Sequence, residues 1–504
     1  MKRGILIVMT VLLIPPVFGK ASVKSDSADL QKARPNIVFF LVDDMGWQDT
    51  SVPFYTEVTE LNKRYRTPNM ERLASEGMKF TQAYSSAVCS PSRVSLMTGL
   101  TAARHRVTNW TLTKNVSPDE DNPKVKSPDW NLNGLSPVSG IPHTIVYANT
   151  LPALLKKAGY KTIHVGKAHF GAAGTPGENP LNFGFDVNIG GHAAGGPGSY
   201  LGIHDYSADW RVAGDHRWDV PGLEAYHGEN IYLTEALTRE AIKSVEMAVK
   251  DKQPFYLYMS HYAIHAPWEK DERYYQKYID EGLSQSEAIY ATMIEGMDKS
   301  LGDIMDELDR LGVAENTIII FSSDNGAHKQ VPQNLPLRGY KLSPYEGGIR
   351  VPMIVKWPGV VKPESVTKDY VIIEDVYPTF LEMAGLNKDI NKSIDGRSFV
   401  SLLKGYRKTD SDRALLWHYP NTYYNPPYTV VRQGDWKLIY HHISGQLELF
   451  NLAEDIGETN DLSVKLADKT SQLAVLMTKL LKDTEAQMPI EKATGLPIAY
   501  PSAL

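Results

Sequence analysis

Short runs of almost unbroken apolar residues alternate with helical segments along most of this chain, and this alternation constrains the fold more than any other feature. Residues 36–42 read NIVFFLV, and similar runs follow at 160–165, 254–259 and 317–322. Strands that are apolar at nearly every position are buried on both faces, as in parallel sheets covered by helices. The pattern therefore predicts an α/β sandwich with a large, mostly parallel central sheet flanked by helices. A further strand is expected at 351–357, and helices are expected at 68–77, 150–158, 230–250, 284–311 and 374–384.

The character of the sequence changes after about residue 410. Strand-like pieces then follow one another closely at 428–433, 436–442 and 446–452, before a helical pattern at 471–484. Closely spaced strands pair as antiparallel neighbours, so we expect a smaller C-terminal α+β subdomain with an antiparallel sheet. The predicted organisation is an α/β domain at 34–405 and this subdomain at 410–490. Long loops are expected at 109–149 and 171–202, and long loops in compact domains are often functional.

Composition narrows the classes of partner. The chain has 504 residues, of which 42% are hydrophobic and 22% are charged, as in globular proteins. The formal net charge is −6 and no basic tract stands out, so nucleic acid is not an expected partner. The single cysteine, Cys89, excludes an intramolecular disulfide framework and a cysteine-rich zinc site.

Residues 1–21 have the pattern of a secretory signal peptide. Lys2 and Arg3 precede a short apolar core at 5–14, and small residues follow at Gly19 and Ala21. The core is shorter than a membrane span, so we expect export to the periplasm or the exterior without a stable membrane anchor. An uncleaved anchor is the alternative interpretation. No cysteine lies near the cleavage point, so a lipoprotein is excluded.

Acidic and amide side chains follow two of the predicted strands. Asp43 and Asp44 come directly after the first apolar run, and Asp324 and Asn325 come after the fourth. Ligands bind beyond the carboxyl ends of strands in open α/β sheets, so we expect these side chains at one edge of the sheet. Three carboxylates and an amide offer only oxygen ligands, which suit Ca²⁺, or else Mg²⁺, rather than zinc. The alternative is that both pairs form strand-end turns or helix caps.

Basic side chains are expected at the same edge. Two of them follow the run at 160–165 and one follows the run at 254–259. Any one of them alone could be a solvated or structural residue. Together with three carboxylates and a divalent cation they would leave an excess of positive charge, which favours a negatively charged substrate. The set is Arg93, Lys167, His169, His265 and Lys341.

Cys89 lies in the stretch SAVCSPSRVSLMTG, which has the pattern of a helix start. Ser90 is the expected N-cap and Pro91 the first helical residue. Cys89 would then lie at a helix N-terminus, where backbone N–H groups and the helix dipole favour an anion. An unmodified thiol there would be a nucleophile with a lowered pKa. A buried, inert cysteine is the alternative.

Several of these segments match a known set of signatures. CSPSR at 89–93, continuing through Leu96, Thr98 and Gly99, resembles the signature of type I sulfatases, in which the cysteine is converted to formylglycine (3-oxoalanine). The resemblance runs from about residue 34 to about residue 465 and includes bacterial carbohydrate sulfatases and arylsulfatases. It implies an alkaline-phosphatase-like sandwich and a sulfuric ester hydrolase. The other matching segments are RPNIVFFLVDDMGWQD, GYKTIHVGKAHFG, AIHAP, FSSDNGA, RGYKLSPYEGGIRVPMIVKWPG, RQGDWKLIYHH and ELFNLAEDIGETNDL.

The resemblance also implies a role for each matching residue. The gem-diol of formylglycine at position 89 would attack sulfur, Arg93 and Lys167 would hold that diol, and His169 resembles the base that later deprotonates it. His265 and Lys341 would contact the sulfate, with His265 favoured as the acid that protonates the leaving oxygen. A formylglycine-generating maturation enzyme is implied as a partner. The implied ligands of one Ca²⁺ are Asp43, Asp44, Asp324 and Asn325, with modified Cys89 also touching the metal.

Loop residues point to a sulfated carbohydrate as substrate. The segments ARHRVTNW and WHYP look like those of bacterial polysaccharide-degrading sulfatases, and aromatic rings stack on sugar faces. We expect desulfation at a chain end, with galactose or N-acetylgalactosamine sulfates as the first guess. Packing between the subdomains is the alternative role of the aromatic residues. The candidate substrate-binding residues are Trp110, His261, His418 and Tyr419.

Two other functions compete with this interpretation. The first is a phosphonate or phosphate monoester hydrolase of the alkaline phosphatase superfamily, some of which also use formylglycine. The second is a protein that binds sulfated glycans without cleaving them. Comparing rates on matched sulfate and phosphate esters distinguishes the first alternative from a sulfatase. The second alternative predicts glycan binding without sulfate release, and a Cys89→Ala variant should leave that binding unchanged.

Overall fold

Strand β1 (Asn36–Val42) lies inside a mixed sheet and is buried along its whole length. The computed structural model describes residues 1, 34–330, 334–386, 393–406 and 412–502, and residues from Arg34 onward form one compact unit. Nine strands of the described residues form this sheet, in the order β11-β2-β10-β9-β1-β8-β6-β7, with β12 paired to β2. The remaining strands are β2 (Met78–Tyr84), β6 (Lys161–Gly166), β7 (Val187–Ile189), β8 (Phe255–Ser260), β9 (Thr317–Ser323), β10 (Arg350–Lys356), β11 (Ser365–Thr367) and β12 (Val371–Ile372).

The sheet is mostly parallel, as the sequence predicts. β1 pairs in parallel with both β8 and β9, and β6 pairs in parallel with β8 and β7. β10 is the exception, because it runs antiparallel to β9 and to β2. The start of β10 therefore lies at the same edge of the sheet as the ends of β9, β1, β8 and β6.

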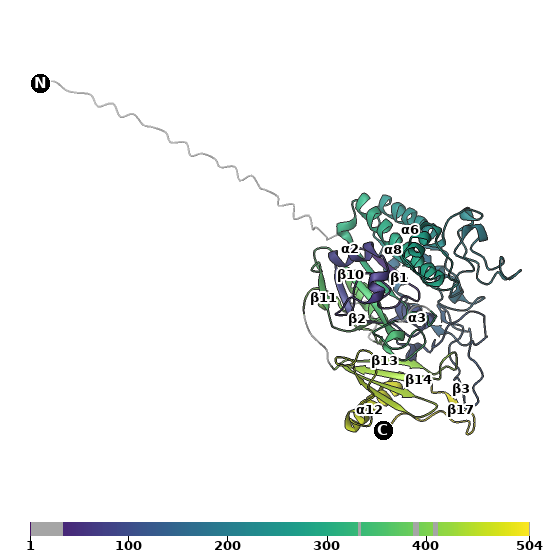
Figure 1. Cartoon of the computed structure of the whole chain (residues 1–504). Helices are drawn as coiled ribbons and strands as arrows, with labels where there is room; N and C mark the ends of the chain where they lie inside the picture. The colour runs from purple at the N-terminus through teal and green to yellow at the C-terminus, as the bar shows by residue number, and fades with distance from the viewer. Residues whose placement is uncertain (2–33, 331–333, 387–392, 407–411, 503–504) are drawn as a thin grey trace. The chain divides into compact units, whose positions relative to one another are not determined.

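Helices cover both faces of the sheet (Figure 1). Ile37, Phe39 and Leu41 of β1 belong to one hydrophobic cluster, and Val38 and Phe40 belong to another, as the two-residue period of a strand requires. The first cluster includes residues of α3, α5 and α10, and the second includes residues of α2, α6 and α8. The helices are α1 (Glu60–Arg64), α2 (Pro68–Glu76), α3 (Cys89–Thr98), α4 (Ala102–His105), α5 (Leu151–Lys157), α6 (Leu233–Lys250), α7 (Glu272–Asp280), α8 (Gln285–Arg310), α9 (Glu346–Ile349), α10 (Val376–Met383), α11 (Val400–Leu403) and α12 (Ala467–Asp483).

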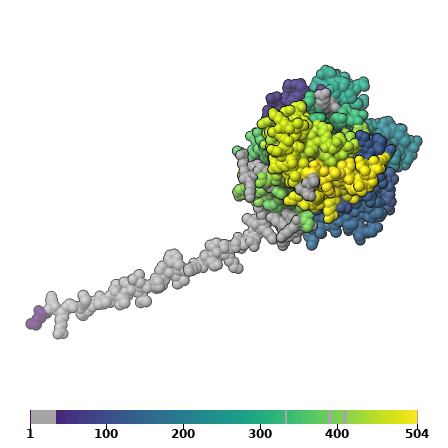
Figure 2. All heavy atoms as spheres, turned by 90° about the horizontal axis from the view of Figure 1, so that it is seen from below, coloured from purple at the N-terminus to yellow at the C-terminus, as the bar shows by residue number. Residues whose placement is uncertain are grey.

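A second, antiparallel sheet follows, as expected for the C-terminal part. It consists of β13 (Ala414–Tyr419), β14 (Tyr428–Gln433), β15 (Trp436–His441) and β16 (Leu447–Asn451). One face of it packs into the cluster on the α3 side of the main sheet, and α12 covers the other face. Figure 2 looks onto this end of the compact unit, where the yellow C-terminal residues form much of the surface. The two sheets share one hydrophobic core, so the packing does not mark where one domain ends and the next begins. The domain boundary predicted between residues 405 and 410 therefore stays a prediction.

Four strands of the main sheet were not expected from the sequence: β2, β7, β11 and the two-residue β12. β2 and β11 carry polar residues at several positions, and β7 lies inside the glycine-rich stretch expected to be a loop. The loop expected at 109–149 holds three two-residue strands: β3 (Val125–Lys126), which pairs with β17 (Ile490–Glu491), and the mutually paired β4 (Leu135–Ser136) and β5 (Ile145–Val146). The signal peptide expected at 1–21 lies outside the described residues apart from Met1. In the described part of the chain, every helix is too short or too polar to span a bilayer.

A buried charge cluster joins the C-terminal sheet to the main domain. Lys437 Nζ of β15 lies 3.0 Å from Glu346 Oε1 of α9 and 2.8 Å from Glu458 Oε1, and all three side chains are inaccessible to solvent. Removal of the ammonium group would leave buried Glu458 without its cation and buried Glu346 with only Arg350, whose Nη1 lies 3.3 Å from Glu346 Oε2.

We expect Lys437→Met to lower the free energy of unfolding by about 3–5 kcal/mol, the usual cost of breaking a buried ion pair from one side. Lys492→Met is the matched control, since Lys492 pairs with Asp121 at the surface, and it should cost at most about 1 kcal/mol. Urea unfolding of the three proteins measures both values. Equal midpoints for Lys437→Met and the unsubstituted protein would contradict the assigned role of this cluster.

Candidate active site

Four neighbouring parallel strands deliver polar groups to one edge of the sheet. β9, β1, β8 and β6 are consecutive in the sheet, and Val42 lies in register with Ser323. The residues that follow these two positions, Asp43 and Asp324, therefore start side by side. The common edge receives Asp324 and Asn325 after β9, Asp43 and Asp44 after β1, His265 after β8, and Lys167 and His169 after β6.

Asp43, Asp44 and Asp324 form a buried acidic cluster at this edge. One ligand oxygen of each lies within 4.8 Å of the others. Asp43 Oδ1 and Asn325 Oδ1 are buried and lack a hydrogen-bond partner in the described residues. Unpartnered buried oxygens are costly, and an all-oxygen set of this kind is what hard divalent cations prefer. These four residues therefore fit a divalent metal ion, as predicted.

Basic side chains lie against the same carboxylates. Lys167 Nζ is 2.6 Å from Asp43 Oδ2, and Lys341 Nζ is 2.5 Å from Asp44 Oδ1. Burial and the charge of Asp324 raise the pKa of Asp43 well above its ordinary value. Burial also acts to raise the pKa of Asp44, but Lys341 and the other nearby cations outweigh it and hold that pKa far below its usual range. Asp44 is therefore ionised at neutral pH.

Arg93 connects the acidic cluster to two further strands. Its Nε donates to Asp324 Oδ2 at 2.9 Å, and its Nη1 donates to the carbonyl of Lys167 at 2.9 Å and to Ser260 Oγ at 2.5 Å. The guanidinium is fully buried. Burial acts to lower its pKa, but Asp324 outweighs this effect and raises the pKa, so Arg93 stays charged.

Cys89 lies in the first turn of α3. The structure corrects two expectations that the sequence raised for it. The helix begins at Cys89 itself, with Val88 as its N-cap, so Ser90 and Pro91 lie inside the helix rather than at its boundary. The expected low pKa of the thiol is also wrong, because burial raises the pKa of Cys89 despite the nearby Lys167 and Lys341. The thiol is therefore protonated at neutral pH, and unmodified Cys89 is a poor nucleophile.

The two histidines of the site present defined nitrogens. His169 Nε2 lies 2.7 Å from the carbonyl oxygen of Thr111 and must donate to it, which leaves Nδ1 as an unpartnered acceptor. His265 Nδ1 likewise donates to the carbonyl of Ala266 at 2.7 Å, so Nε2 faces Asp44 Oδ2 at 3.9 Å. Burial lowers the pKa of His265 to about 3, and burial with Lys167 lowers that of His169 well below its usual value. Both rings are neutral at pH 7.

The glycine-rich stretch expected to be functional packs against both rings. A Cβ at Gly195 would lie 2.5 Å from His169 Cε1, and one at Gly196 would lie 2.8 Å from His265 Nδ1. Any larger residue at either position would displace a histidine. Asp44 and His169 also adopt positive φ angles of 63° and 54°, so the site holds side chains on uncommon backbone conformations.

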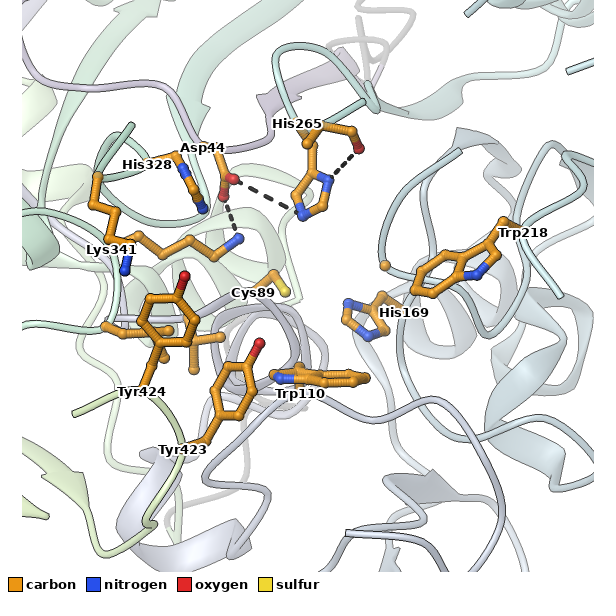
Figure 3. Close-up of a pocket in the computed structure, with 15 residues that line it drawn as sticks. Asp44, Cys89, Trp110, His169, Trp218, His265, His328, Lys341, Tyr423 and Tyr424 are labelled. Atoms are coloured by element: carbon orange, nitrogen blue, oxygen red, sulfur yellow. Dashed lines mark hydrogen bonds and ion pairs between the residues drawn. The ribbon is translucent and has the colours of Figure 1, made fainter. Parts of the chain in front are cut away.

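These groups surround an open cavity of about 300 Å³ (Figure 3). Figure 3 shows Asp44, His265 and His328 along one side, with Trp110, Tyr423 and Tyr424 facing them and Cys89 between the two sides. Of the predicted residues, Asp43, Asp324, Asn325, Arg93 and Lys167 lie buried behind the cavity. Those that line it are Asp44, Cys89, Trp110, His169, His265 and Lys341.

The aromatic side of the cavity is built from two distant loops. The ring centres of Trp110 and Tyr423 lie 5.6 Å apart in an edge-to-face contact. Asp119 joins the loops, since its carboxylate accepts from Asn109 Nδ2 at 3.1 Å and from Asn421 Nδ2 at 3.1 Å. Hydrogen bonds next to both rings therefore set the spacing of this wall.

Three predicted substrate-binding residues lie away from the cavity. His261 is in the core beneath α8, where its Nε2 lies 2.9 Å from Ser300 Oγ and its ring packs on Phe40. His418 is buried between Thr429 and the carbonyl of Gln487. Tyr419 stacks on Tyr428 in the shared core. These predictions are corrected because packing against other elements takes up each side chain.

Other cavity residues were missed by the sequence analysis. They are Trp218, His328 and Lys329. His328 and Lys329 come shortly after Asp324 and Asn325, so their distance from the predicted strand end is the signal that could have identified them. Trp218 lies in a segment without a strand or helix, and no local pattern marks it.

Known proteins are similar to this chain in both sequence and fold. The Sulfatase family matches residues 35–386, and the family described as N-sulphoglucosamine sulphohydrolase, C-terminal, matches residues 341–487. A sulfatase of Formosa agariphila is 30% identical, with 96% of this chain and 93% of that protein aligned. Human N-acetylgalactosamine-6-sulfatase is 31% identical, with 91% of this chain and 87% of that protein aligned.

Solved structures agree with the fold. The crystal structure of Ps i-CgsB in complex with k-i-k-neocarrahexaose is 25% identical, with a TM-score of 0.72 over 90% of this chain and 93% of that one. The structure of BT4656 in complex with its substrate D-glucosamine-2-N,6-O-disulfate is 20% identical, with a TM-score of 0.63 over 90% and 98% of the two chains. The second similarity concerns the fold alone.

The acidic cluster predicts a thermal response to a divalent cation. Added Ca²⁺ should raise the melting temperature of the protein, because an ion that binds only the folded state stabilises it by about 2.7 kcal/mol at a hundred times its dissociation constant. Asn325→Ala and Asp324→Asn should reduce or abolish that rise. Asp306→Asn, at an exposed carboxylate, is the control and should retain it. A rise of equal size in all four proteins would show that the ion binds elsewhere.

Proposed function

Because the chain belongs to the sulfatase family, whose members are sulfuric ester hydrolases, we propose that it removes sulfate from a sulfated carbohydrate by means of formylglycine at position 89. The observation that carries this proposal is the position of Cys89. It is the only cysteine of the chain and lies at the floor of the cavity, between an acidic cluster and an aromatic wall.

A carbohydrate ester is favoured by two observations. Trp110, Tyr423 and Tyr424 present aromatic faces on which a sugar ring can stack. A relative aligned over most of the chain is named N-acetylgalactosamine-6-sulfatase, and a solved neighbour is in complex with k-i-k-neocarrahexaose. We therefore propose galactose-type or N-acetylgalactosamine sulfates at a chain end as the substrates to test first.

The proposed metal is one Ca²⁺ held by Asp43, Asp44, Asp324 and Asn325. The unpartnered Oδ1 atoms of Asp43 and Asn325 support this set. When bound, the ion would supply positive charge next to position 89 and to the sulfate oxygens. Lys167 pairs with Asp43 behind the cavity and Lys341 pairs with Asp44 at its wall, so both would add positive charge that favours an anion.

Conversion of Cys89 to formylglycine would supply a hydrated aldehyde, which carries two hydroxyl groups. One hydroxyl would take the sulfuryl group from the sugar oxygen. The second hydroxyl, once deprotonated, would expel sulfate as the aldehyde re-forms. Three proton movements accompany these bond changes. The attacking hydroxyl loses its proton as its oxygen bonds to sulfur. The departing sugar oxygen gains a proton as its bond to sulfur breaks, and the remaining hydroxyl loses one as sulfate leaves. The chain needs an acid and a base within reach of position 89.

His169 is the proposed base. Its Nε2–H is held by the Thr111 carbonyl, so the free lone pair is on Nδ1. His265 is the proposed acid, acting through Nε2, with Lys341 as the other candidate at the same side of the cavity. Bound sulfate next to His265 would raise its low pKa toward protonation, because a nearby negative charge favours the imidazolium.

Export and maturation complete the proposal. The signal-peptide pattern at 1–21 supports a periplasmic or secreted location. Formylglycine requires a maturation enzyme that acts on the CSPSR segment, so that enzyme is a proposed partner. Phosphate or phosphonate ester hydrolysis, and glycan binding without cleavage, remain the alternatives to be tested.

The first experiment measures sulfate release from a panel of singly sulfated saccharides, with protein from a host that makes formylglycine. We expect desulfation at one ring position, and Cys89→Ala should reduce it to the level without enzyme. The mass of the peptide that carries residue 89 checks the conversion. Release from matched phosphate esters but not from sulfate esters would overturn the proposal, as would release that survives in Cys89→Ala.

Comparing two leaving groups tests the acid. A sugar alkoxide needs protonation as it leaves, whereas nitrophenolate does not, and general acid catalysis contributes about 10²–10⁴-fold. His265→Ala should therefore lower kcat/KM for a sugar sulfate by about that factor and affect nitrophenyl sulfate far less. Equal losses on both substrates would exclude His265 as the acid and favour Lys341.

A further inference from the structure

One cation of the cavity wall has no task in the proposed reaction. Lys329 lines the cavity, and its Nζ lies 3.8 Å from the centre of the Tyr424 ring. The ring holds the ammonium by a cation–π contact at the rim, where the lysine is exposed. Among the residues that the structure describes, Lys329 has no recorded carboxylate partner, whereas Lys341 is paired with Asp44.

Among the described charged residues that line the cavity, no carboxylate is left to balance the positive charge of Lys329. Asp44 is the one carboxylate among the described lining residues, and Lys341 neutralises it. His328 adds no positive charge, because burial lowers its pKa. The amine of Lys329 is thus a fixed positive charge with free hydrogen-bond donors, available to a ligand.

Lys329 also lies at the end of a continuous aromatic strip. Trp110 contacts Tyr423, Tyr423 contacts Tyr424 with ring centres 5.4 Å apart, and Tyr424 carries the ammonium of Lys329. Figure 3 shows the three rings along one side of the cavity, across from Asp44 and His265. A saccharide stacked on this strip would place one group at Cys89 and another near Lys329.

We propose that Lys329 and Tyr424 form a subsite for a second anionic group of the saccharide, in addition to the sulfate that is removed at position 89. The inference rests on the proposed function and extends it from a sulfated carbohydrate to one with two negative groups. The second group is a sulfate ester or a uronate carboxylate, since both accept charge-assisted hydrogen bonds from an ammonium. A neutral sugar at this position would leave the amine without a partner.

The test compares one saccharide sulfate in three forms: with no second anion, with a second sulfate, and with a neighbouring uronate. The unsubstituted enzyme should prefer one of the two dianionic forms, and the preferred one identifies the group. Lys329→Met should lower kcat/KM for that form by about three- to tenfold, mainly through KM, and change the singly charged form by less than about twofold. Added salt should reduce the preference in the unsubstituted enzyme and have little effect in the variant.

Two further variants control the experiment. Lys329→Arg keeps the charge and should retain most of the preference, and Lys479→Met removes an exposed lysine of α12 outside the cavity and should change nothing. An unchanged preference in Lys329→Met, or no preference in the unsubstituted enzyme, would overturn the subsite and leave the proposed function intact. Failure of the unsubstituted enzyme to release sulfate from any of the three forms would overturn both.

Discussion

The buried guanidinium of Arg93 is the interaction on which the rest of the site depends. It bonds to Asp324 after β9, to Ser260 at the end of β8 and to the carbonyl of Lys167 after β6. Three strand ends are thereby tied to α3 at a point one turn after Cys89, where the helix begins. Ser92 adds a second link, since its hydroxyl donates to the carbonyl of Asp324 at 2.5 Å. The position of Cys89 thus follows from the charge that the helix brings into the core.

The free-energy cost of burying the Arg93 guanidinium is offset because the carboxylates that pair with it are buried as well. Three carboxylates and three permanent cations meet at the sheet edge, with Asp43, Asp44, Asp324, Arg93 and Lys167 all fully or almost fully buried. A buried ion is costly unless it is paired and hydrogen-bonded. A divalent cation added to a balanced set would leave net positive charge, which is the condition for holding a doubly charged anion such as sulfate.

Burial also separates groups that look alike in the sequence. His261 and His265 are four residues apart after the same strand, yet one is enclosed between Phe40 and Ser300 and the other opens into the cavity. His418 and Tyr419 were predicted at the substrate because aromatic and imidazole groups suit sugars. The C-terminal sheet instead turns Tyr419 into the shared core and His418 toward Thr429 and the carbonyl of Gln487. The neighbouring Tyr423 and Tyr424 reach the cavity. Packing against distant elements decides which of these side chains reaches the cavity. A local sequence pattern carries no information about that packing.

The sequence by itself determined the apolar strands, the polar residues at their ends and the motif around Cys89. These features are local, because strand burial on both faces requires unbroken apolar runs and parallel strands bring their ends to one edge. β2 was missed since MKFTQAY mixes polar and apolar positions, although this strand leads into α3. Only the tertiary structure decided the protonated state of the Cys89 thiol, the hydrogen bonds that orient His169 and His265, and the meeting of Lys329 with Tyr424. Each of these depends on groups brought together from far apart in the chain, whose burial and distance are properties of the packed molecule.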